Sequence, residues 1–491
     1  MLRTVLFLVL SLALTGMIFF RYDQRFGNDG IPSLGKRATY LPYYAAFLLP
    51  AEVLLIPLLL SPFVGFSQAV DITLSTCVGI FLHISLYILV LLALRPLLRG
   101  RISARTCALL WVIPNILYLT TSRAYQPSRP VWVVMIPSQW SHLWFVLWFA
   151  GAVGVLGWYM IQHLRFRHGI LASATPVTDP QTQYIWEEAL REAGLRNPKY
   201  QLVISPAVQT PLSIGLLPRS TRVVLPPRPY TPEELHWIIR HEVIHLARMD
   251  NWNKFFLLFC TAICWFNPLM WVAMKTCAQD LELSCDETVL LFAHQPDRKE
   301  YAALLLNTAG DARGFTTCLS ASASTLRHRL QQILTPSVRS SGALVAGLLF
   351  FLMTMSFGCV GLAQGTISGA QVFSPAGDTA PYQVSGIHVQ HPDYQEEGMD
   401  YTLSHPQAFQ AYLSGLTLSR LMGTYTFPDQ EREFYCFLSH DQDEYLLAIT
   451  DDLMEVTLLG RGDYPTYYYL PQGFDWDYLM GLLEATPSPY A

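Results

Sequence analysis

Long apolar stretches dominate the first third of the chain, and one more follows far downstream. They cover about 4–20, 41–66, 72–94, 106–120, 131–161 and 341–363. Each is long enough, or nearly so, to cross a hydrocarbon core of about 30 Å. No small-residue cleavage site follows the first stretch, so we expect a retained helix rather than a signal peptide. The pattern predicts a multi-pass α-helical membrane protein, with about five spans in residues 1–163 and one more at 341–363.

Positively charged residues in the short loops predict the orientation of these spans. Lysines and arginines near span ends collect on the cytoplasmic side of a membrane. They follow the first, third and fifth apolar stretches, as Arg21, Arg25, Lys36, Arg37, Arg95, Arg99, Arg101, Arg105, Arg165 and Arg167, whereas Arg3, Arg123 and Arg129 oppose this scheme. We therefore expect residues 164–340 in the cytoplasm and both the N-terminus and the end of the chain outside it.

One acidic residue, Glu52, lies within the second apolar stretch. An ionisable group at membrane depth is a functional candidate. A carboxylate close to the interface, or one satisfied by a kinked neighbouring helix, explains it more simply. We therefore assign no role to Glu52.

The last part of the chain changes character twice. Residues 364–395 are rich in Gly, Ser, Pro and Gln, which predicts a linker. Alternating and aromatic runs then predict a small extracytoplasmic α+β domain at 396–491. Its expected elements are a helix at 406–421, strands at 434–438, 445–450, 455–459 and 466–470, and a closing helix at 476–484.

Composition and charge support a division between two compartments. Of 491 residues 52% are hydrophobic and 14% are charged, whereas a typical soluble domain has about 25% charged residues. A single soluble enzyme and a direct nucleic-acid-binding surface are therefore both poor fits to this chain, whose net charge is -5. From Ala363 onward 18 acidic residues stand against three arginines, which leaves the rest of the chain strongly positive. The nine cysteines are scattered and indicate no disulfide framework.

A well-defined helix start follows Pro229. Thr231 can cap the helix, Pro232 suits its first position, and Glu234 can close a capping box. Further along the same helix, His241, Glu242 and His245 form the pattern His-Glu-x-x-His.

This pattern carries specific chemistry. Two histidines four residues apart project from one helix face and can bind one Zn²⁺. Glu242 beside them can act as a general base toward the attacking water. We therefore predict a zinc-dependent metalloendopeptidase site built on His241, His245 and Glu242.

A catalytic zinc usually has three protein ligands, so a third donor is expected downstream. In the run 280–287 a helix would place Glu282, Cys285 and Asp286 on one face and turn Asp280 and Glu287 away. We expect Glu282 as the third ligand, and Asp286 as the carboxylate that orients a ligating histidine through its free ring N–H. Cys285 is an alternative ligand, although a small buried residue is the simpler interpretation.

Residues 255–275 form another apolar run, which hydropathy alone would assign to a span. A single crossing there would put Glu282 on the opposite side of the membrane from the histidines. Asn267-Pro268 interrupts the run. We therefore expect a bent, re-entrant or groove-lining element close to the bilayer.

A short strand is expected just before the metal-binding helix, at Val223, Val224 and Leu225. Pro226 and Pro227 end it, and proline cannot donate ladder hydrogen bonds. A strand left open on one side can bind an extended peptide. The run therefore predicts a substrate-binding edge strand, with an ordinary core strand as the competing interpretation.

The motifs taken together resemble the BlaR/MecR family of integral-membrane zinc peptidases. The resemblance covers about 165–363 and rests on Val223–Pro226, His241–His245 with Arg248 and Asp250, Trp265–Pro268, Glu282–Glu287 and Arg327–Leu334. It implies a zincin-like, gluzincin-type α+β peptidase domain with His241, His245 and Glu282 as ligands and Glu242 as base. It also implies that an extracytoplasmic sensor signals across the bilayer, and that cleavage is linked to inactivation of a transcriptional repressor.

Two features depart from the best-known members of that family. The additional hairpin at about 95–130 has no counterpart in them. Their β-lactam sensor is acylated at the serine of a Ser-x-x-Lys motif, whereas the last lysine of this chain is Lys299. Acylation of the C-terminal domain by that chemistry is therefore excluded.

The leading hypothesis is a membrane-embedded zinc endopeptidase that cleaves a cytoplasmic protein during transmembrane signalling. The expected substrate is a winged-helix transcriptional repressor, or the chain itself, and the expected stimulus is an unknown extracytoplasmic ligand. A catalytically silent receptor and a housekeeping membrane protease are the competing hypotheses. Glu242 favours an enzyme, because a structural zinc site has no use for a general base.

Overall fold

The chain was analysed as a computed structural model. It describes residues 59, 61–63, 65–111, 113–114, 130, 132–136, 141–195, 200–216, 219–290, 293–308, 323–335, 340, 342–356, 360–373, 383–390, 399–422, 432–440, 443–459 and 465–487. These residues divide between two compact units. The described residues of unit 1 lie within His83–Thr121 and Trp148–Met355, and those of unit 2 lie within Val53–Leu82, Ser122–Leu147 and Ser356–Ala491. The expected first span, most of the second and Glu52 lie outside the described residues.

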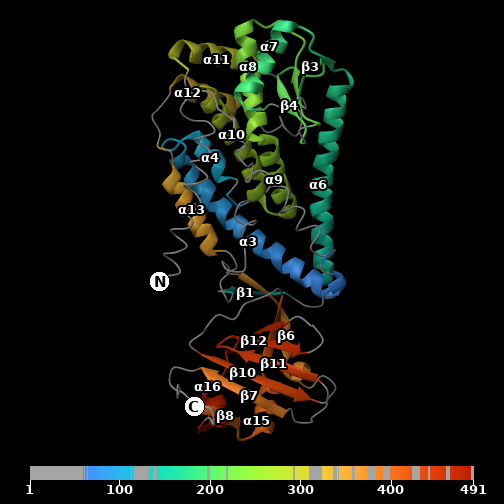
Figure 1. The fold of residues 1–491 in the computed structure, drawn as a ribbon, viewed down its shortest axis with the longest axis vertical. Coiled ribbons are helices and arrows are strands. Elements are labelled where there is room, and N and C mark those ends of the chain that lie inside the picture. Colours follow the sequence, from blue (N-terminus) through green and yellow to red (C-terminus); the bar gives the residue numbers. More distant parts are fainter. Residues whose placement is uncertain are drawn as a thin grey trace. The chain divides into compact units, whose positions relative to one another are not determined.

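Two described helices are long and apolar enough to cross a membrane. α3 (Phe66–Leu98) contains the candidate span Cys77–Leu98, and α6 (Ser141–Ala172) contains Leu143–Ala172. Figure 1 labels both helices. The third and fifth apolar stretches therefore correspond to helices of spanning length.

The structure departs from the predicted spans at the start of the fifth stretch and at the sixth. Of the fourth stretch, 106–120, the structure describes α4 (Ala104–Leu110) with its C-cap Trp111, and residues 115–120 lie outside the described residues. The stretch at 131–161 begins as a strand, β1 (Trp132–Ile136). The helix expected at 341–363 is shorter, because α13 (Ala343–Ser356) ends before the strand β6 (Val360–Ser368). Hydropathy locates these apolar segments, but it does not distinguish a short apolar strand from a helix.

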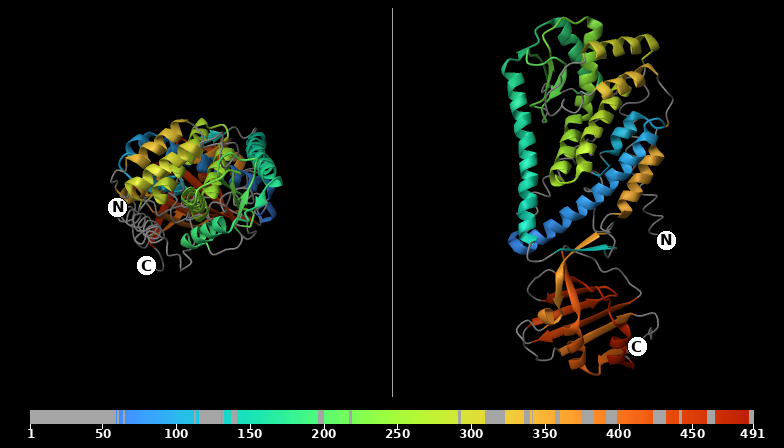
Figure 2. Two further views of the ribbon diagram at one scale, coloured as in Figure 1. Left: turned by 90° about the horizontal axis from the view of Figure 1, so that it is seen from above. Right: turned by 180° about the vertical axis from the view of Figure 1, so that it is seen from behind.

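Unit 1 combines a small sheet with a set of helices (Figure 1). The sheet has the order β2-β3-β5-β4. Val223 and Leu225 pack on α7 and α8, and Val224 packs on the end of α6. The right-hand view of Figure 2 shows the small sheet beside the long helix α6. The bounds are β2 (Thr175–Pro176), α7 (Pro180–Glu192), β3 (Gln201–Ile204), β4 (Leu212–Ile214), β5 (Arg222–Leu225), α8 (Pro232–Arg248), α9 (Asp250–Ile263), α10 (Pro268–Val289), α11 (Gln295–Thr308) and α12 (Ala323–Leu334).

The prediction that Val223, Val224 and Leu225 form an open edge is wrong. β5 pairs in parallel with β3 on one side and antiparallel with β4 on the other. Side chains alternate across a strand, and here both faces of β5 are covered, so all three residues are at most 2% exposed. The competing interpretation, an ordinary core strand, is therefore the correct one.

The helix starts that the sequence predicts are confirmed. The Thr231 hydroxyl accepts from the Glu234 amide, and the Glu234 carboxylate accepts from the Thr231 amide, which completes a capping box on α8. The apolar run at 255–275 is broken where predicted, because α9 ends at Ile263 and Asn267 caps α10. The two helices pack against one another through Leu258 and Met274. Residues on both sides of this bend therefore belong to the same unit.

In unit 2, a sheet of ten described strands has the order β1-β6-β9-β13-β12-β11-β10-β7-β8-β14. Its core gathers large apolar side chains, including Phe409, Phe434, Leu447 and Leu479. The elements not yet bounded are α14 (Ala370–Phe373), β7 (Gln383–Gln390), β8 (Met399–Leu403), α15 (Pro406–Gly415), β9 (Thr417–Met422), β10 (Glu433–His440), β11 (Asp443–Ile449), β12 (Leu453–Leu459), β13 (Thr466–Tyr469), α16 (Trp476–Leu482) and β14 (Leu483–Pro487).

Two predictions for unit 2 need correction. The helix expected at 406–421 stops at Gly415, and residues 417–422 form β9 because they pair with β6 and β13. The expected linker at 364–395 contains the end of β6 and the whole of β7, which pairs with β10. Both corrections involve pairing between residues distant in sequence, which a local pattern does not encode.

Candidate metal centre

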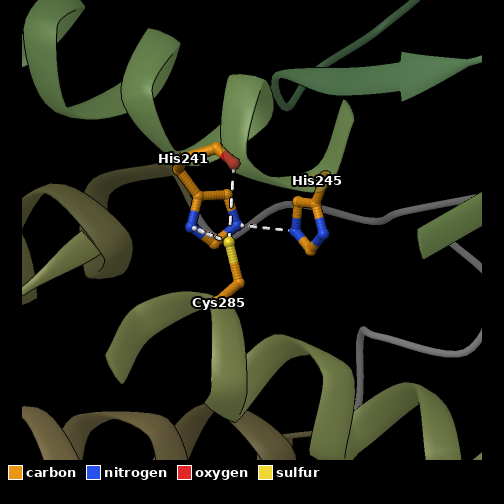
Figure 3. A group of neighbouring side chains, drawn as sticks. All are labelled: His241, His245 and Cys285. Atoms are coloured by element: carbon orange, nitrogen blue, oxygen red, sulfur yellow. Dashed lines mark hydrogen bonds between the residues drawn. The ribbon is translucent and has the colours of Figure 1, made fainter. Parts of the chain in front are cut away.

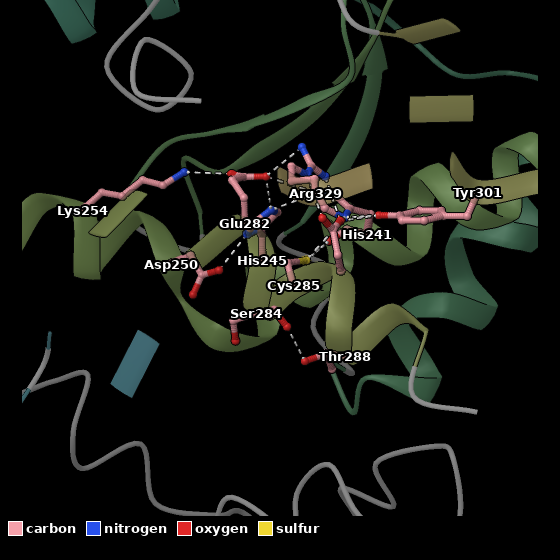
Figure 4. A network of polar contacts seen from close by, with 11 residues as sticks. His241, His245, Asp250, Lys254, Glu282, Ser284, Cys285, Thr288, Tyr301 and Arg329 are labelled. Carbon is pink, nitrogen blue, oxygen red and sulfur yellow. Dashed lines mark hydrogen bonds and ion pairs between the residues drawn. The ribbon is translucent and has the colours of Figure 1, made fainter. Parts of the chain in front are cut away.

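Two facing helices supply the candidate metal-binding side chains. His241 and His245 extend from α8, and Cys285 extends from α10 toward them (Figure 3). Glu282 lies one turn before Cys285 on α10 and also reaches the histidines (Figure 4). His245 and Glu282 are buried, with 8% and 6% of their surface exposed. The structure therefore brings together the two residues of the motif and the predicted third donor.

The distances between donor atoms match those around a tetrahedral zinc. The two Nε2 atoms are 3.1 Å apart, and Glu282 Oε2 is 3.6 Å from His241 Nε2 and 3.7 Å from His245 Nε2. Zinc bonds of about 2.0–2.2 Å in tetrahedral geometry place such donors about 3.3–3.6 Å from one another. These residues therefore fit a zinc ion without rearrangement of the helices.

Cys285 offers a second donor set with the same histidines. One donor atom from each of His241, His245 and Cys285 lies within 4.8 Å of the others. The thiol, however, is 3.5 Å from His241 Nδ1, on the other side of that ring from the nitrogen that faces His245. The two histidines thus have two candidate third donors, Glu282 and Cys285.

A direct carboxylate partner orients His245. Asp250 Oδ2 is 2.7 Å from His245 Nδ1, and Arg248 Nε is 3.3 Å from Asp250 Oδ1. Met249, between α8 and α9, takes a left-handed conformation with φ 53°, which turns the chain so that Asp250 returns toward His245. A proton shared on Nδ1 leaves the Nε2 lone pair for a metal.

His241 is oriented through a tyrosine. The Tyr301 hydroxyl donates to Asp286 Oδ1 over 2.8 Å and lies 2.8 Å from His241 Nδ1. Because the hydroxyl proton points to Asp286, its oxygen can accept the Nδ1 proton of His241. Asp286 itself is 3.6 Å from Nδ1. In the described geometry, Asp286 thus acts on His241 through Tyr301 rather than by the direct bond that the sequence suggested.

Two cations hold the carboxylates of α10 (Figure 4). Lys254 Nζ is 3.6 Å from Glu282 Oε1, and Arg329 Nη1 is 3.5 Å from Glu282 Oε2. Arg329 also donates to both oxygens of Asp286, over 2.7 and 2.8 Å. A buried carboxylate requires such partners, because desolvation strongly penalises an isolated charge.

The electrostatics of the site favour positive charge at the ring nitrogens. Burial alone would lower the pKa of His241, but the neighbouring Cys285 and Glu282 outweigh it and raise the pKa to about 10. The pKa of His245 is likewise raised despite burial, by Cys285, Glu282 and Asp250. Burial would raise the pKa of Glu282, but the histidines and Lys254 hold it well below its usual value. A divalent cation can replace these protons and satisfy the same carboxylate.

The remaining predicted site residues are the general base Glu242, which lies on α8, and the substrate-binding strand, which lies in the core of the sheet. Glu242 is 7% exposed on α8, next to His241 in the chain. Val223, Val224 and Leu225 belong to the sheet core.

Comparison with known proteins places this centre in a family. Residues 121–333 match the model described as BlaR1 peptidase M56. This part of the chain is similar to the peptidase domain of the BlaR/MecR family. The regulatory protein BlaR1 of Bacillus licheniformis is 26% identical over 153 residues, which cover 29% of this chain and 25% of that protein. The methicillin resistance mecR1 protein of Staphylococcus aureus is 24% identical over 173 residues, or 34% of this chain and 28% of the relative. The matches thus span little more than a quarter of these relatives.

The matched stretch includes residues that sequence reasoning left without a role. Lys254, Tyr301 and Arg329 all lie within the matched stretch and contact the metal centre. Asp250 entered only as part of the family pattern. Its position five residues after His245 was the available signal, whereas Tyr301 and Arg329 reach the site from helices whose packing the sequence does not reveal.

Proposed function

We propose that the protein is a membrane-embedded zinc endopeptidase that cleaves a cytoplasmic protein in response to a signal from outside the membrane. The observation that carries the proposal is the convergence of His241 Nε2, His245 Nε2 and Glu282 Oε2 within 3.1–3.7 Å. We assign His241, His245 and Glu282 as the ligands of one Zn²⁺ in a zincin-like domain.

The chain's own residues have separate tasks in peptide hydrolysis. When bound, zinc supplies Lewis acidity that activates water and polarises the scissile carbonyl. Glu242 accepts the proton of the attacking water and returns it to the leaving amine as general base and then general acid. Asp250 and Tyr301 hold the two imidazoles with Nε2 toward the centre. Lys254 holds the second oxygen of Glu282, so that only one oxygen of this carboxylate faces the histidines.

The signalling role extends the family assignment. We propose that the chain crosses the membrane several times, with the peptidase domain in the cytoplasm and the C-terminal α+β domain outside. The substrate is a winged-helix transcriptional repressor or the chain itself. The absence of lysine after Lys299 supports a stimulus other than β-lactam acylation of the C-terminal domain.

Metal analysis of the purified full chain in detergent tests the ligand assignment. We expect one zinc per chain in the parent and in Cys285→Ser, and loss of zinc in His245→Ala and Glu282→Ala. Retention of full zinc stoichiometry in His245→Ala would refute the site. Loss of zinc in Cys285→Ser together with retention of zinc in Glu282→Ala would identify Cys285, rather than Glu282, as the third ligand.

A further inference from the structure

A buried carboxylate lies on the side of α10 that faces away from the metal centre. Asp280 is 2% exposed, although it precedes Glu282 by only two residues. At 3.6 residues per turn, two positions differ by about 200° around the helix axis. Asp280 therefore belongs to the outer face of α10, as its sequence position predicts.

Three side chains from the end of α3 and from α4 enclose this carboxylate. Arg99 donates to Oδ1 from Nη2 over 2.6 Å and from Nε over 2.9 Å. Arg95 Nε and Trp111 Nε1 donate to Oδ2 over 3.2 and 2.9 Å. Arg95 also donates to the side chain of the preceding residue, Gln279, over 3.0 Å. Arg95 Nη2 also donates to Oδ1 over 3.5 Å, so five donor atoms hold the two oxygens of this buried group.

A second contact repeats the arrangement two turns further along α10. Glu287 Oε2 accepts from the backbone amide of Ala104 over 2.5 Å, and Arg105 Nε is 3.7 Å from Oε1. Ala104 begins α4, where a carboxylate compensates the positive end of the helix dipole. Asp280 and Glu287 therefore bind the outer face of α10 to the segment 95–111 at two points along the helix.

The two faces of α10 are mechanically coupled. The inner face carries Glu282, whose Oε2 must reach both histidines, and a helix of this length transmits rotation or sliding from one face to the other. A metal site tolerates little displacement of a ligand, since donor positions are set to within a few tenths of an ångström. The contacts that hold Asp280 therefore also set the axial position and the rotation of α10. They thereby set the position of Glu282 relative to His241 and His245.

We propose that Asp280 is a positioning residue for the metal centre, through which Arg95, Arg99 and Trp111 hold α10 in the register that lets Glu282 bind zinc. This inference rests on the proposed function. The partners of Asp280 precede residue 121, where the family match begins. Arg95 belongs to the last turn of the candidate span Cys77–Leu98. The segment 95–111, which the sequence left unexplained, thereby connects a membrane-crossing helix to the ligand helix.

The test compares zinc affinity with fold in the full-length protein. Asp280→Asn keeps the shape of the side chain and removes the charge that the two arginines share. Zinc affinity is measured by chelator competition, alongside the kcat and KM of cleavage and the thermal unfolding temperature. We expect one zinc at saturation, an affinity about 10–100-fold weaker, as for other outer partners of metal ligands, and a lower kcat with little change in KM. Glu300→Gln, which neutralises an exposed carboxylate on α11, is the matched control and should keep the parental affinity.

Milder substitutions at the partners of Asp280 keep the test informative if one variant does not fold. Arg99→Lys keeps the charge and should restore most of the affinity that Arg99→Gln loses. Trp111→Phe removes one hydrogen bond to Asp280 and should give a smaller loss. If Asp280→Asn, Arg99→Gln and Trp111→Phe change only the unfolding temperature, Asp280 is merely structural and the inference fails. A parent protein that binds no zinc and cleaves nothing would instead overturn the proposed function.

Discussion

The peptidase part of unit 1 and the sheet of unit 2 bury different kinds of side chain. Around the metal centre the buried residues include His245, Arg248, Asp250, Lys254, Glu282 and Asp286. Among the described residues of the sheet at 360–487, the buried polar ones are Ser419, Glu433 and Thr450, and the core is made of aromatic and aliphatic side chains. Burying a charge costs several kcal/mol unless partners compensate it. Such a concentration of buried, paired charges is expected at a functional site, whereas an apolar core contributes to the stability of the fold.

This difference separates two kinds of expected mutational effect. Substitutions in the charge network should change metal binding or catalysis more than fold, and substitutions in the sheet core should change fold alone. Each prediction below tests one side of that division, beginning with the largest expected effect.

Replacing the general base should give the largest loss of activity. Glu242→Gln keeps the side-chain shape but cannot accept the proton of the attacking water, so we expect cleavage to fall about 10²–10⁴-fold. Zinc content and thermal stability should stay at parental values. Cleavage of the chain itself or of a co-expressed repressor, read by immunoblot, measures the effect. A parental cleavage rate in this variant would favour a silent zinc site over a peptidase.

Shortening a side chain at the centre of the sheet core should instead lower stability and leave zinc binding unchanged. Phe434 is fully buried and packs edge-to-face on Phe409 at 5.7 Å. Phe434→Ala should destabilise the sheet by about 3–5 kcal/mol, the range for buried aromatic truncations. Pulse proteolysis in urea measures this loss, and the exposed control Gln407→Ala should stay within about 0.5 kcal/mol of the parent.

Zinc affinity in the same Phe434→Ala protein tests the comparison directly. It should equal that of the parent, because no described contact links Phe434 to the metal centre. A fall in zinc affinity that accompanies the loss of sheet stability would show that the two regions do not behave independently.

The sequence predicted more of the metal centre than of the sheets. The capping box of α8, the break at Asn267 and the shared face of Glu282 and Asp286 follow from local spacing, and the structure has all three. The edge strand at Val224 was wrong because the position of β4 beside β5 depends on pairing across intervening residues. Tyr301 and Arg329 were missed for the same reason, since they come from α11 and α12.

Removing the partner of His245 should weaken metal binding without destroying it. Asp250→Asn loses the charged acceptor that lies 2.7 Å from Nδ1, so the imidazole is less well oriented and less basic. We expect zinc affinity to fall about 10–100-fold. Glu187→Gln, on the exposed side of α7, is the charge-matched control. If zinc affinity is unchanged in Asp250→Asn, the charge network around His245 serves folding rather than the metal.

Zinc binding should also depend on pH. Cys285 and Glu282 raise the pKa of both His241 and His245 against the effect of burial, so the metal-free rings favour the protonated form at neutral pH. Zinc must displace these protons, so zinc affinity should rise with pH, by about tenfold per pH unit for each proton released. Chelator competition at pH 6, 7 and 8 measures the slope. A flat profile would show that both rings are already neutral before zinc binds.

The smallest expected effect concerns the start of the metal-binding helix. Thr231→Ala removes one half of the capping box on α8 and should lower the free energy of unfolding of this domain by about 0.5–2 kcal/mol. Thr231→Ser keeps the hydroxyl that accepts from the Glu234 amide, so it should restore most of that stability. The cap is ten residues, or nearly three turns, before His241, and α8 is also held by its packing on the sheet. Zinc affinity should therefore remain parental in both variants. A loss of zinc affinity in Thr231→Ala that the serine variant restores would show that fraying at this end of α8 reaches the metal, so that local helix stability and not only the charge network sets the site.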